Sequence, residues 1–168
     1  AISGVFIVNQ IQFLLQSICG SISDGTVVIC SRYWGEGDTD RIKRAGAASM
    51  QFGLIVSGVM MLAALFFPTE VLGLLTDKPH VIAEGEKYLF IVAFTYMFFA
   101  ATQVLLGILR SVETAFIGFI NSCAALVVNL VLNYILIFGH FGAPAMGIRG
   151  AAIATLVSRI VEFVIVVL

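Results

Sequence analysis

The chain has 168 residues, of which 60% are hydrophobic and 11% are charged, and its mean hydropathy is +1.07. Soluble domains are about 45–50% apolar and about 25% charged, so this composition excludes a soluble enzyme core and a disordered tail. Nine basic and ten acidic residues leave a net charge of −1, which excludes the cationic surface that nucleic-acid binding needs.

Long apolar runs predict an all-α integral membrane protein, a polytopic bundle of about five transmembrane helices. Each run is long enough for the ~20 residues of a membrane span, and an open sheet edge cannot face lipid. Pro68 ends the second run and Gly139 ends the fourth. The predicted spans are residues 1–31, 46–67, 88–109, 114–139 and 150–168. Because the first residues lack a signal peptide and the last run has no polar flank, we expect the middle of a longer protein.

Basic residues between the spans predict the orientation of the chain. The segments after the first and third spans carry five of them, against three on the opposite side: Arg32, Arg41, Lys43, Arg44 and Arg110 against Lys78, Lys87 and Arg149. Short loops rich in lysine and arginine stay in the cytoplasm. We therefore expect the polar loop at residues 32–45 to be cytoplasmic.

Polar residues recur along one face of the first span. Asn9, Gln12 and Gln16 follow each other at three- and four-residue spacing, which places them on one side of a helix. Polar groups within a span are costly unless they face a partner or a water-filled cavity. The first span is therefore predicted to turn this side inward and an apolar side, which includes Ile11, Leu14 and Leu15, toward lipid.

Two further spans carry polar faces of the same kind. The third has Thr102 and Gln103 beside Phe99, and the fourth has a stripe that ends in Asn129 and Asn133. Three such faces could line a shared cavity, or they could only join the helices through hydrogen bonds worth ~0.6 kcal/mol each. The predicted cavity residues are Asn9, Gln12, Gln16, Thr102 and Gln103, with Phe99 as an apolar contact.

Two side-chain pairs indicate an ion or proton function. Asn129 and Asn133 lie one turn apart, and their amide oxygens suit a hard cation such as sodium if another helix adds a carboxylate. Asp24 lies about 12 Å of helix before the basic loop, inside the hydrocarbon, where it serves as a proton relay or as a hydrogen-bond partner. Glu162 lies three residues after Arg159, so the two form a structural ion pair or take part in gating and proton coupling.

Four stretches together resemble the multidrug and toxic compound extrusion (MATE) transporters, over essentially the whole chain. They are VNQIQFLLQ, SRYWGEGD, LGILRSVET and, the most specific, NLVLNYILIFGHFGAPAMGIRGAAIAT. The resemblance implies a twelve-helix transporter of two lobes, in which this chain corresponds to helices two to six of the amino-terminal lobe. It implies that the first helix and the second lobe are missing.

The resemblance also implies a function and a site. The expected activity is secondary active antiport in the plasma membrane, without a cofactor, which exports organic and often cationic compounds in exchange for sodium or protons. By position, Asn129 and Asn133 match the helix-five part of the family's cation site, and Thr155 matches the helix-six part. Some proton-coupled members have an aspartate where this chain has Asn133.

Other functions remain as alternatives. A flippase for lipid-linked sugars, from the same superfamily, needs a cavity rich in arginine and lysine to hold a diphosphate, and the predicted polar stripes contain neither. A channel or a structural membrane subunit is the second alternative, although no filter-like motif is present. An enzyme is not expected, because His80 and His140 lie in predicted loops without a nucleophile motif.

Overall fold

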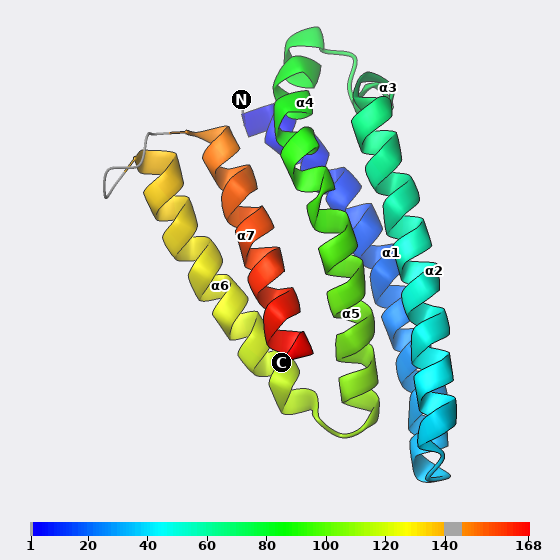
Figure 1. Cartoon of the computed structure of the whole chain (residues 1–168). Coiled ribbons are helices and arrows are strands. Elements are labelled where there is room, and N and C mark those ends of the chain that lie inside the picture. Colours follow the sequence, from blue (N-terminus) through cyan, green and yellow to red (C-terminus); the bar gives the residue numbers. More distant parts are fainter. Residues whose placement is uncertain (1, 140–145) are drawn as a thin grey trace.

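The computed structural model describes residues 2–139 and 146–168, and these residues form helices without any strand (Figure 1). His140 lies outside the described residues. The helices are α1 (Ile2–Gly35), α2 (Thr39–Phe66), α3 (Pro68–Gly73), α4 (Pro79–Ala93), α5 (Thr95–Ser111), α6 (Ala115–Phe138) and α7 (Ile148–Val167).

Most of these helices are long and apolar enough to cross a membrane. Helices α1, α2, α6 and α7 qualify singly, and α4 with α5 adds a fifth crossing when this bent pair is taken as one span. Large apolar side chains such as Ile55, Phe116 and Leu130 are exposed, as expected for a surface that faces lipid. The predicted all-α membrane bundle is confirmed.

The first two helices extend beyond their predicted spans. The charged segment at residues 32–45 is mostly helical, and only residues 36–38 separate α1 from α2. Asp38 caps α2 by accepting a hydrogen bond from the backbone N–H of Arg41 at 3.1 Å. Hydropathy marks only the part of a helix that lies in hydrocarbon, and charged residues can continue the helix beyond it. The prediction of a loop over all of residues 32–45 was therefore wrong.

The third predicted span is not one straight helix. Helices α4 and α5 meet at Phe94 with a bend of 45°. The hydroxyl of Thr95 donates to the carbonyl of Val92 at 2.6 Å, a local bond of the kind that competes with the backbone ladder and bends helices. Neither proline nor glycine stands at the bend, so the usual sequence signals of a kink are missing.

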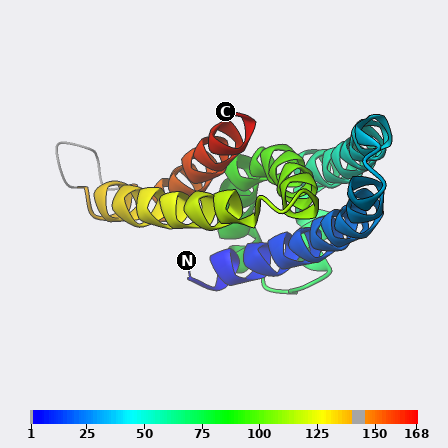
Figure 2. The same cartoon turned by 90° about the horizontal axis from the view of Figure 1, so that it is seen from below.

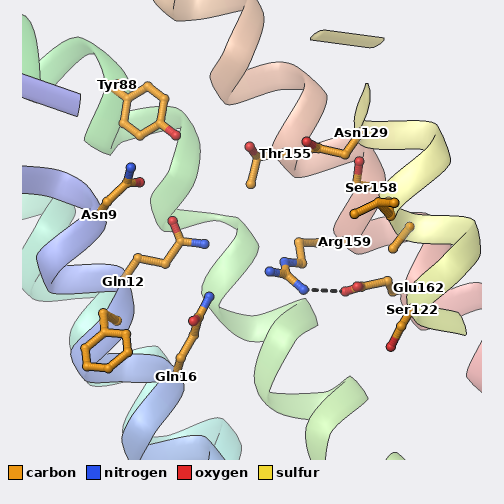
Figure 3. Close-up of a pocket in the computed structure, with 13 residues that line it drawn as sticks. Asn9, Gln12, Gln16, Tyr88, Ser122, Asn129, Thr155, Ser158, Arg159 and Glu162 are labelled. Carbon is orange, nitrogen blue, oxygen red and sulfur yellow. Dashed lines mark hydrogen bonds and ion pairs between the residues drawn. The ribbon is translucent and has the colours of Figure 1, made fainter. Parts of the chain in front are cut away.

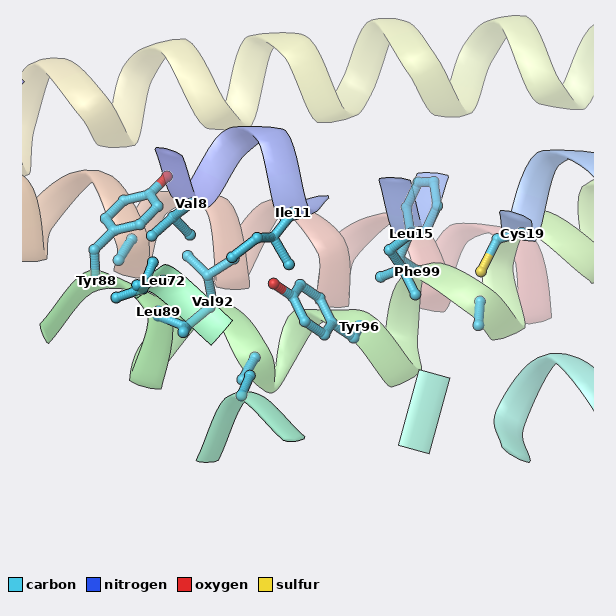
Figure 4. Packing of buried hydrophobic residues seen from close by; sticks show 14 residues of the cluster. Val8, Ile11, Leu15, Cys19, Leu72, Tyr88, Leu89, Val92, Tyr96 and Phe99 are labelled. Atoms are coloured by element: carbon cyan, nitrogen blue, oxygen red, sulfur yellow. The ribbon is translucent and has the colours of Figure 1, made fainter. Parts of the chain in front are cut away.

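An apolar core fills the space between α1, α4 and α5 (Figure 4). Val8, Ile11 and Leu15 of α1 are buried there against Val92 and Tyr96. The apolar side of α1 therefore faces this core as well as lipid, which corrects the prediction of a purely lipid-facing side. Of the predicted apolar side chains, Leu14 remains 56% exposed.

Small residues set the distances between the helices. A Cβ on Gly46 would lie 2.7 Å from the side chain of Ile108, and one on Gly150 would lie 2.6 Å from the carbonyl oxygen of Leu136. Helix α5 consequently packs closely against α2, and α7 against α6. Viewed from below, α5 lies between the α1–α2 pair and the α6–α7 pair (Figure 2).

Candidate functional site

A polar cleft of about 580 Å³ opens between α1, α4, α6 and α7 (Figure 3). Most of the residues that line it are polar, although large apolar side chains are exposed elsewhere on the helices. Its lining residues are Asn9, Gln12, Phe13, Gln16, Tyr88, Ser122, Ala125, Leu126, Asn129, Thr155, Ser158, Arg159 and Glu162.

The α1 wall of the cleft consists of neutral amides. Asn9, Gln12 and Gln16 line it together, since their spacing places them on one face of the helix. Figure 3 shows Gln12 and Gln16 pointing from α1 toward Arg159 on α7. The structure records no side-chain hydrogen bond from these three amides to any described residue, so their donors and acceptors are available to a ligand.

The α6–α7 wall carries polar groups that already have internal partners. The hydroxyl of Thr155 donates to the carbonyl of Ala151 at 3.0 Å. Asn133 donates its amide N–H to Oδ1 of Asn129 at 2.8 Å. A ligand on this wall therefore competes with bonds that are already made, or shares their acceptors.

An ion pair lies in the cleft. Nη1 of Arg159 donates to Oε2 of Glu162 at 2.6 Å, and the two side chains are 21% and 12% exposed. The guanidinium also lies over the ring of Phe99, 4.8 Å from its centroid. The pairing was one of the two predicted roles of these residues, but Arg159 as a cleft residue was not predicted. The polar stripes of the sequence contain no arginine, but the folded cleft contains Arg159. A lack of arginine is therefore no argument against a flippase.

A second, smaller pocket of about 320 Å³ adjoins the first. It contains Thr102 and Gln103, which the sequence assigned to one shared cavity, and it also contains Asn121. Oδ1 of Asn121 is buried without a hydrogen-bond partner among the described residues. Ser122 and Glu162 line both pockets, so Glu162 stands where the two meet.

Three of the predicted site residues line neither polar pocket. Asp24 is exposed and lines neither polar pocket. Asn133 contacts the cleft only through its bond to Asn129, and Phe99 only through Arg159. Sequence reasoning missed Ser158 and Arg159, because three-residue spacing shows that Arg159 can pair with Glu162 and not which neighbouring helix the pair faces.

The cleft offers oxygen ligands but no complete metal site. Asn129 and Thr155 present neutral oxygens to it, and Oδ1 of Asn133 is buried without a partner among the described residues. A hard cation takes six or more oxygen ligands and favours carboxylates among them. The carboxylate in this cleft, Glu162, is neutralised by Arg159, and the described residues contain no cluster of three histidine, cysteine or acidic residues.

Comparisons with known proteins agree on one family. The family model MatE matches residues 1–135. The chain is 30% identical over 169 residues to the probable multidrug resistance protein NorM of Agrobacterium fabrum, covering 99% of this chain and 36% of that protein. It is 29% identical to the protein of the same name from Thermotoga maritima, covering 96% and 35%.

A solved structure has the same fold. The crystal structure of MATE in the bent conformation superposes with a TM-score of 0.88 at 20% identity, over 98% of this chain and 36% of that one. The chain thus spans about a third of the length of the relatives that it matches. Since the family model matches 135 of the 168 residues, the chain belongs to the MatE family.

Proposed function

We propose that the chain is part of the amino-terminal lobe of a twelve-helix transporter, corresponding to helices two to six. The whole protein exports organic, often cationic, compounds in exchange for sodium or protons by alternating access of two lobes. Family membership and the third of a relative's length that the chain spans support this assignment. The small organic substrate, the bilayer and the second lobe are its partners.

The polar cleft gives this proposal its main support. Polar groups within a span are expensive, and where they face a cavity they mark a substrate or ion pathway. Here the α1 amides and the α6–α7 wall line the same cleft, whose volume of about 580 Å³ is in the range of small-molecule sites. Neutral amides both donate and accept hydrogen bonds, which suits many organic compounds more than one fixed ligand.

Coupling to an ion is assigned to the α6–α7 wall. Asn129, Asn133 and Thr155 supply neutral oxygens near each other, and a carboxylate from outside the chain completes the set for sodium. If protons drive transport instead, the carriers in this chain are Glu162 at the junction of the two pockets and Asp24 on α1.

The proposed orientation places the α1–α2 turn in the cytoplasm, with the protein in the plasma membrane. Arg32 and Arg41 flank this turn, and Arg110 ends α5 at the same end of the bundle (Figure 1). Basic residues concentrated at one end follow the rule that positive charge stays inside.

Efflux from vesicles tests the function. The full-length transporter is reconstituted with ethidium, and sodium and pH gradients are imposed separately. If a sodium gradient accelerates ethidium efflux, and if this acceleration is lost in both Asn129→Ala and Asn133→Ala, the result supports the oxygen-ligand site. Gln51→Ala, an amide exposed on α2 outside both polar pockets, is the matched control and retains full coupling.

The other results separate the alternatives. Acceleration by a pH gradient alone moves the coupling to carboxylates, and sodium-driven efflux at the wild-type rate from both asparagine variants overturns the cation site. Efflux that ignores both gradients overturns antiport and favours a channel or a flippase. A flippase is the weaker of these two, because Arg159, the basic residue among the described lining of the larger cleft, is paired with Glu162, and Arg110 lines only the smaller pocket.

A further inference from the structure

Arg159 is held on two sides by groups that both attract a cation. Its guanidinium donates to Oε2 of Glu162 at 2.6 Å and lies over the ring of Phe99 at 4.8 Å from the centroid. The two contacts come from different helices, since Phe99 is on α5 and Glu162 on α7. Arg159 and Glu162 line the cleft, and Figure 3 shows the guanidinium between Glu162 and the α1 wall.

A carboxylate beside an aromatic face is a recognition site for an organic cation. The negative face of the ring attracts cations such as guanidinium and quaternary ammonium groups, most strongly where water is excluded. The carboxylate adds a charge-assisted hydrogen bond or a Coulombic attraction. Glu162 is 12% exposed and Phe99 is buried, so the two groups act where water screens them little.

We propose that Phe99 and Glu162 form an organic-cation subsite that the chain fills with its own Arg159 side chain. An external organic cation binds there only by displacing the guanidinium into the cleft. Arg159 thereby sets the specificity: it lowers the affinity of the cleft for simple monovalent cations and favours compounds whose other contacts, with the α1 amides, compensate for its displacement. This inference rests on the proposed function, in which the cleft takes organic compounds.

The geometry favours an exchangeable occupant over a purely structural ion pair. Residues three apart on a helix pair equally well on an exposed surface, where neither charge loses its water. Here the pair lies in a bundle, where desolvation offsets much of the Coulombic gain. Removing the arginine leaves Glu162 nearly buried with no positive partner, a state that any suitable cation relieves.

Binding to the purified full-length transporter tests the subsite. Equilibrium binding of tetraphenylphosphonium and of methylguanidinium is measured without an ion gradient for the wild type and for Arg159→Ala. The expected result is binding about tenfold tighter in the variant, a gain of about 1.4 kcal/mol. Arg149→Ala removes an exposed arginine from the same helix and leaves both affinities unchanged.

Second substitutions identify the two groups that receive the cation. Adding Glu162→Gln or Phe99→Leu to Arg159→Ala abolishes the gain. Phe98→Leu is the matched control for the ring, because Phe98 packs on Phe163 and does not contact the guanidinium, and it preserves the gain. If Arg159→Ala proves too unstable to purify, Arg159→Met keeps most of the side-chain volume and is expected to show the same gain.

Three results would overturn the subsite. They are equal affinity for both organic cations in wild type and Arg159→Ala, a gain that survives either Phe99→Leu or Glu162→Gln, or, in a parallel titration with sodium, a gain for sodium without one for the organic cations. A failed transport assay does not affect this test, since binding is measured without a gradient. Conversely, gradient-driven efflux with unchanged binding in Arg159→Ala leaves the proposed function standing and removes only the subsite.

Discussion

The two walls of the cleft are built in opposite ways. On α1, the amides of Asn9, Gln12 and Gln16 line the cleft without a side-chain hydrogen bond to the described residues. On α6 and α7, the polar groups are already engaged: Asn133 bonds Asn129, and Arg159 bonds Glu162. One wall has no internal side-chain bonds among the described residues, and the other receives a ligand by exchanging or sharing bonds that are already made.

This difference assigns separate tasks to the walls. A ligand that bonds the α1 amides displaces only water, so contacts there tolerate many shapes at a small free-energy gain each. A ligand that displaces an internal bond of the α6–α7 wall, such as that between Arg159 and Glu162, links its binding to a change in that wall. Alternating access needs such a link, because a ligand shifts a conformational equilibrium only through contacts that differ between the states.

Breaking the ion pair should produce the largest effect on stability. Glu162→Gln leaves Arg159 in the cleft without its carboxylate. Breaking a fully buried pair costs about 3–5 kcal/mol, and the residual exposure of these side chains reduces the expected loss to about 2–3 kcal/mol. Thermal unfolding of the detergent-solubilised transporter measures it. Glu70→Gln, exposed on α3 with no recorded ion pair to described residues, is the control, and an equal loss in both variants would contradict the assignment.

Widening the contact between α6 and α7 should produce the next largest effect. Gly150→Ala places a Cβ 2.6 Å from the carbonyl oxygen of Leu136, and overpacking of this kind costs about 1–3 kcal/mol. Gly58→Ala on α2 has nothing within 4 Å of the new Cβ, so it should stabilise its helix by about 0.5–1 kcal/mol. Unfolding measurements that give both variants the same sign would show that the two helices are not packed as described.

Removing the bond between the asparagines should have a smaller effect. Asn133→Leu eliminates the donor to Oδ1 of Asn129 and also an Oδ1 that is buried without a described partner. The lost hydrogen bond is worth about 1 kcal/mol, and the removal of an unsatisfied polar atom offsets part of it. The expected net change is below about 1 kcal/mol in thermal unfolding, together with a loss of ion coupling. A loss above about 2 kcal/mol would mean that the pair is chiefly structural.

The smallest effect on stability is expected at the α1 wall. Gln12→Leu and Gln16→Leu break no recorded bond to the described residues, so stability should change by less than about 0.5 kcal/mol. Efflux of polar organic compounds should fall several-fold, because the cleft loses donors and acceptors. Gln10→Leu alters an amide of the same helix that lines a separate, mainly apolar groove between α1, α2 and α3, and it should leave efflux unchanged. Equal efflux from all three variants would remove the α1 wall from the pathway.

The sequence predicted the helices well and their three-dimensional relations in part. The length of the apolar runs indicated where the helices lie. Gly139 indicated the end of α6, where it adopts φ 73°. Periodicity placed Asn9, Gln12 and Gln16 on one face. The bend at Phe94 was not predictable from proline or glycine, and the direction of Arg159 depends on how α7 is rotated against α5, which packing decides.

The same limit explains the divided cavity. Thr102 and Gln103 were predicted to share one cavity with the α1 amides, yet they open into the second pocket. Periodicity reports which side of a helix is polar and does not report how far along the bundle each residue meets its neighbours. Glu162, which lines both pockets, gains its position from that packing as well.

Cysteine accessibility tests whether the cleft is a water-filled substrate site. Gln12→Cys is introduced into a full-length transporter without other cysteines, and its reaction with a charged thiol reagent is followed with and without an organic cation. Leu14→Cys, exposed on the apolar groove between α1, α2 and α3 and absent from the lining of the cleft, is the control. We expect rapid labelling at position 12 that the cation slows, and slow labelling at position 14. Equal labelling at both positions, or labelling at position 12 that the cation leaves unchanged, would contradict a water-filled substrate cleft.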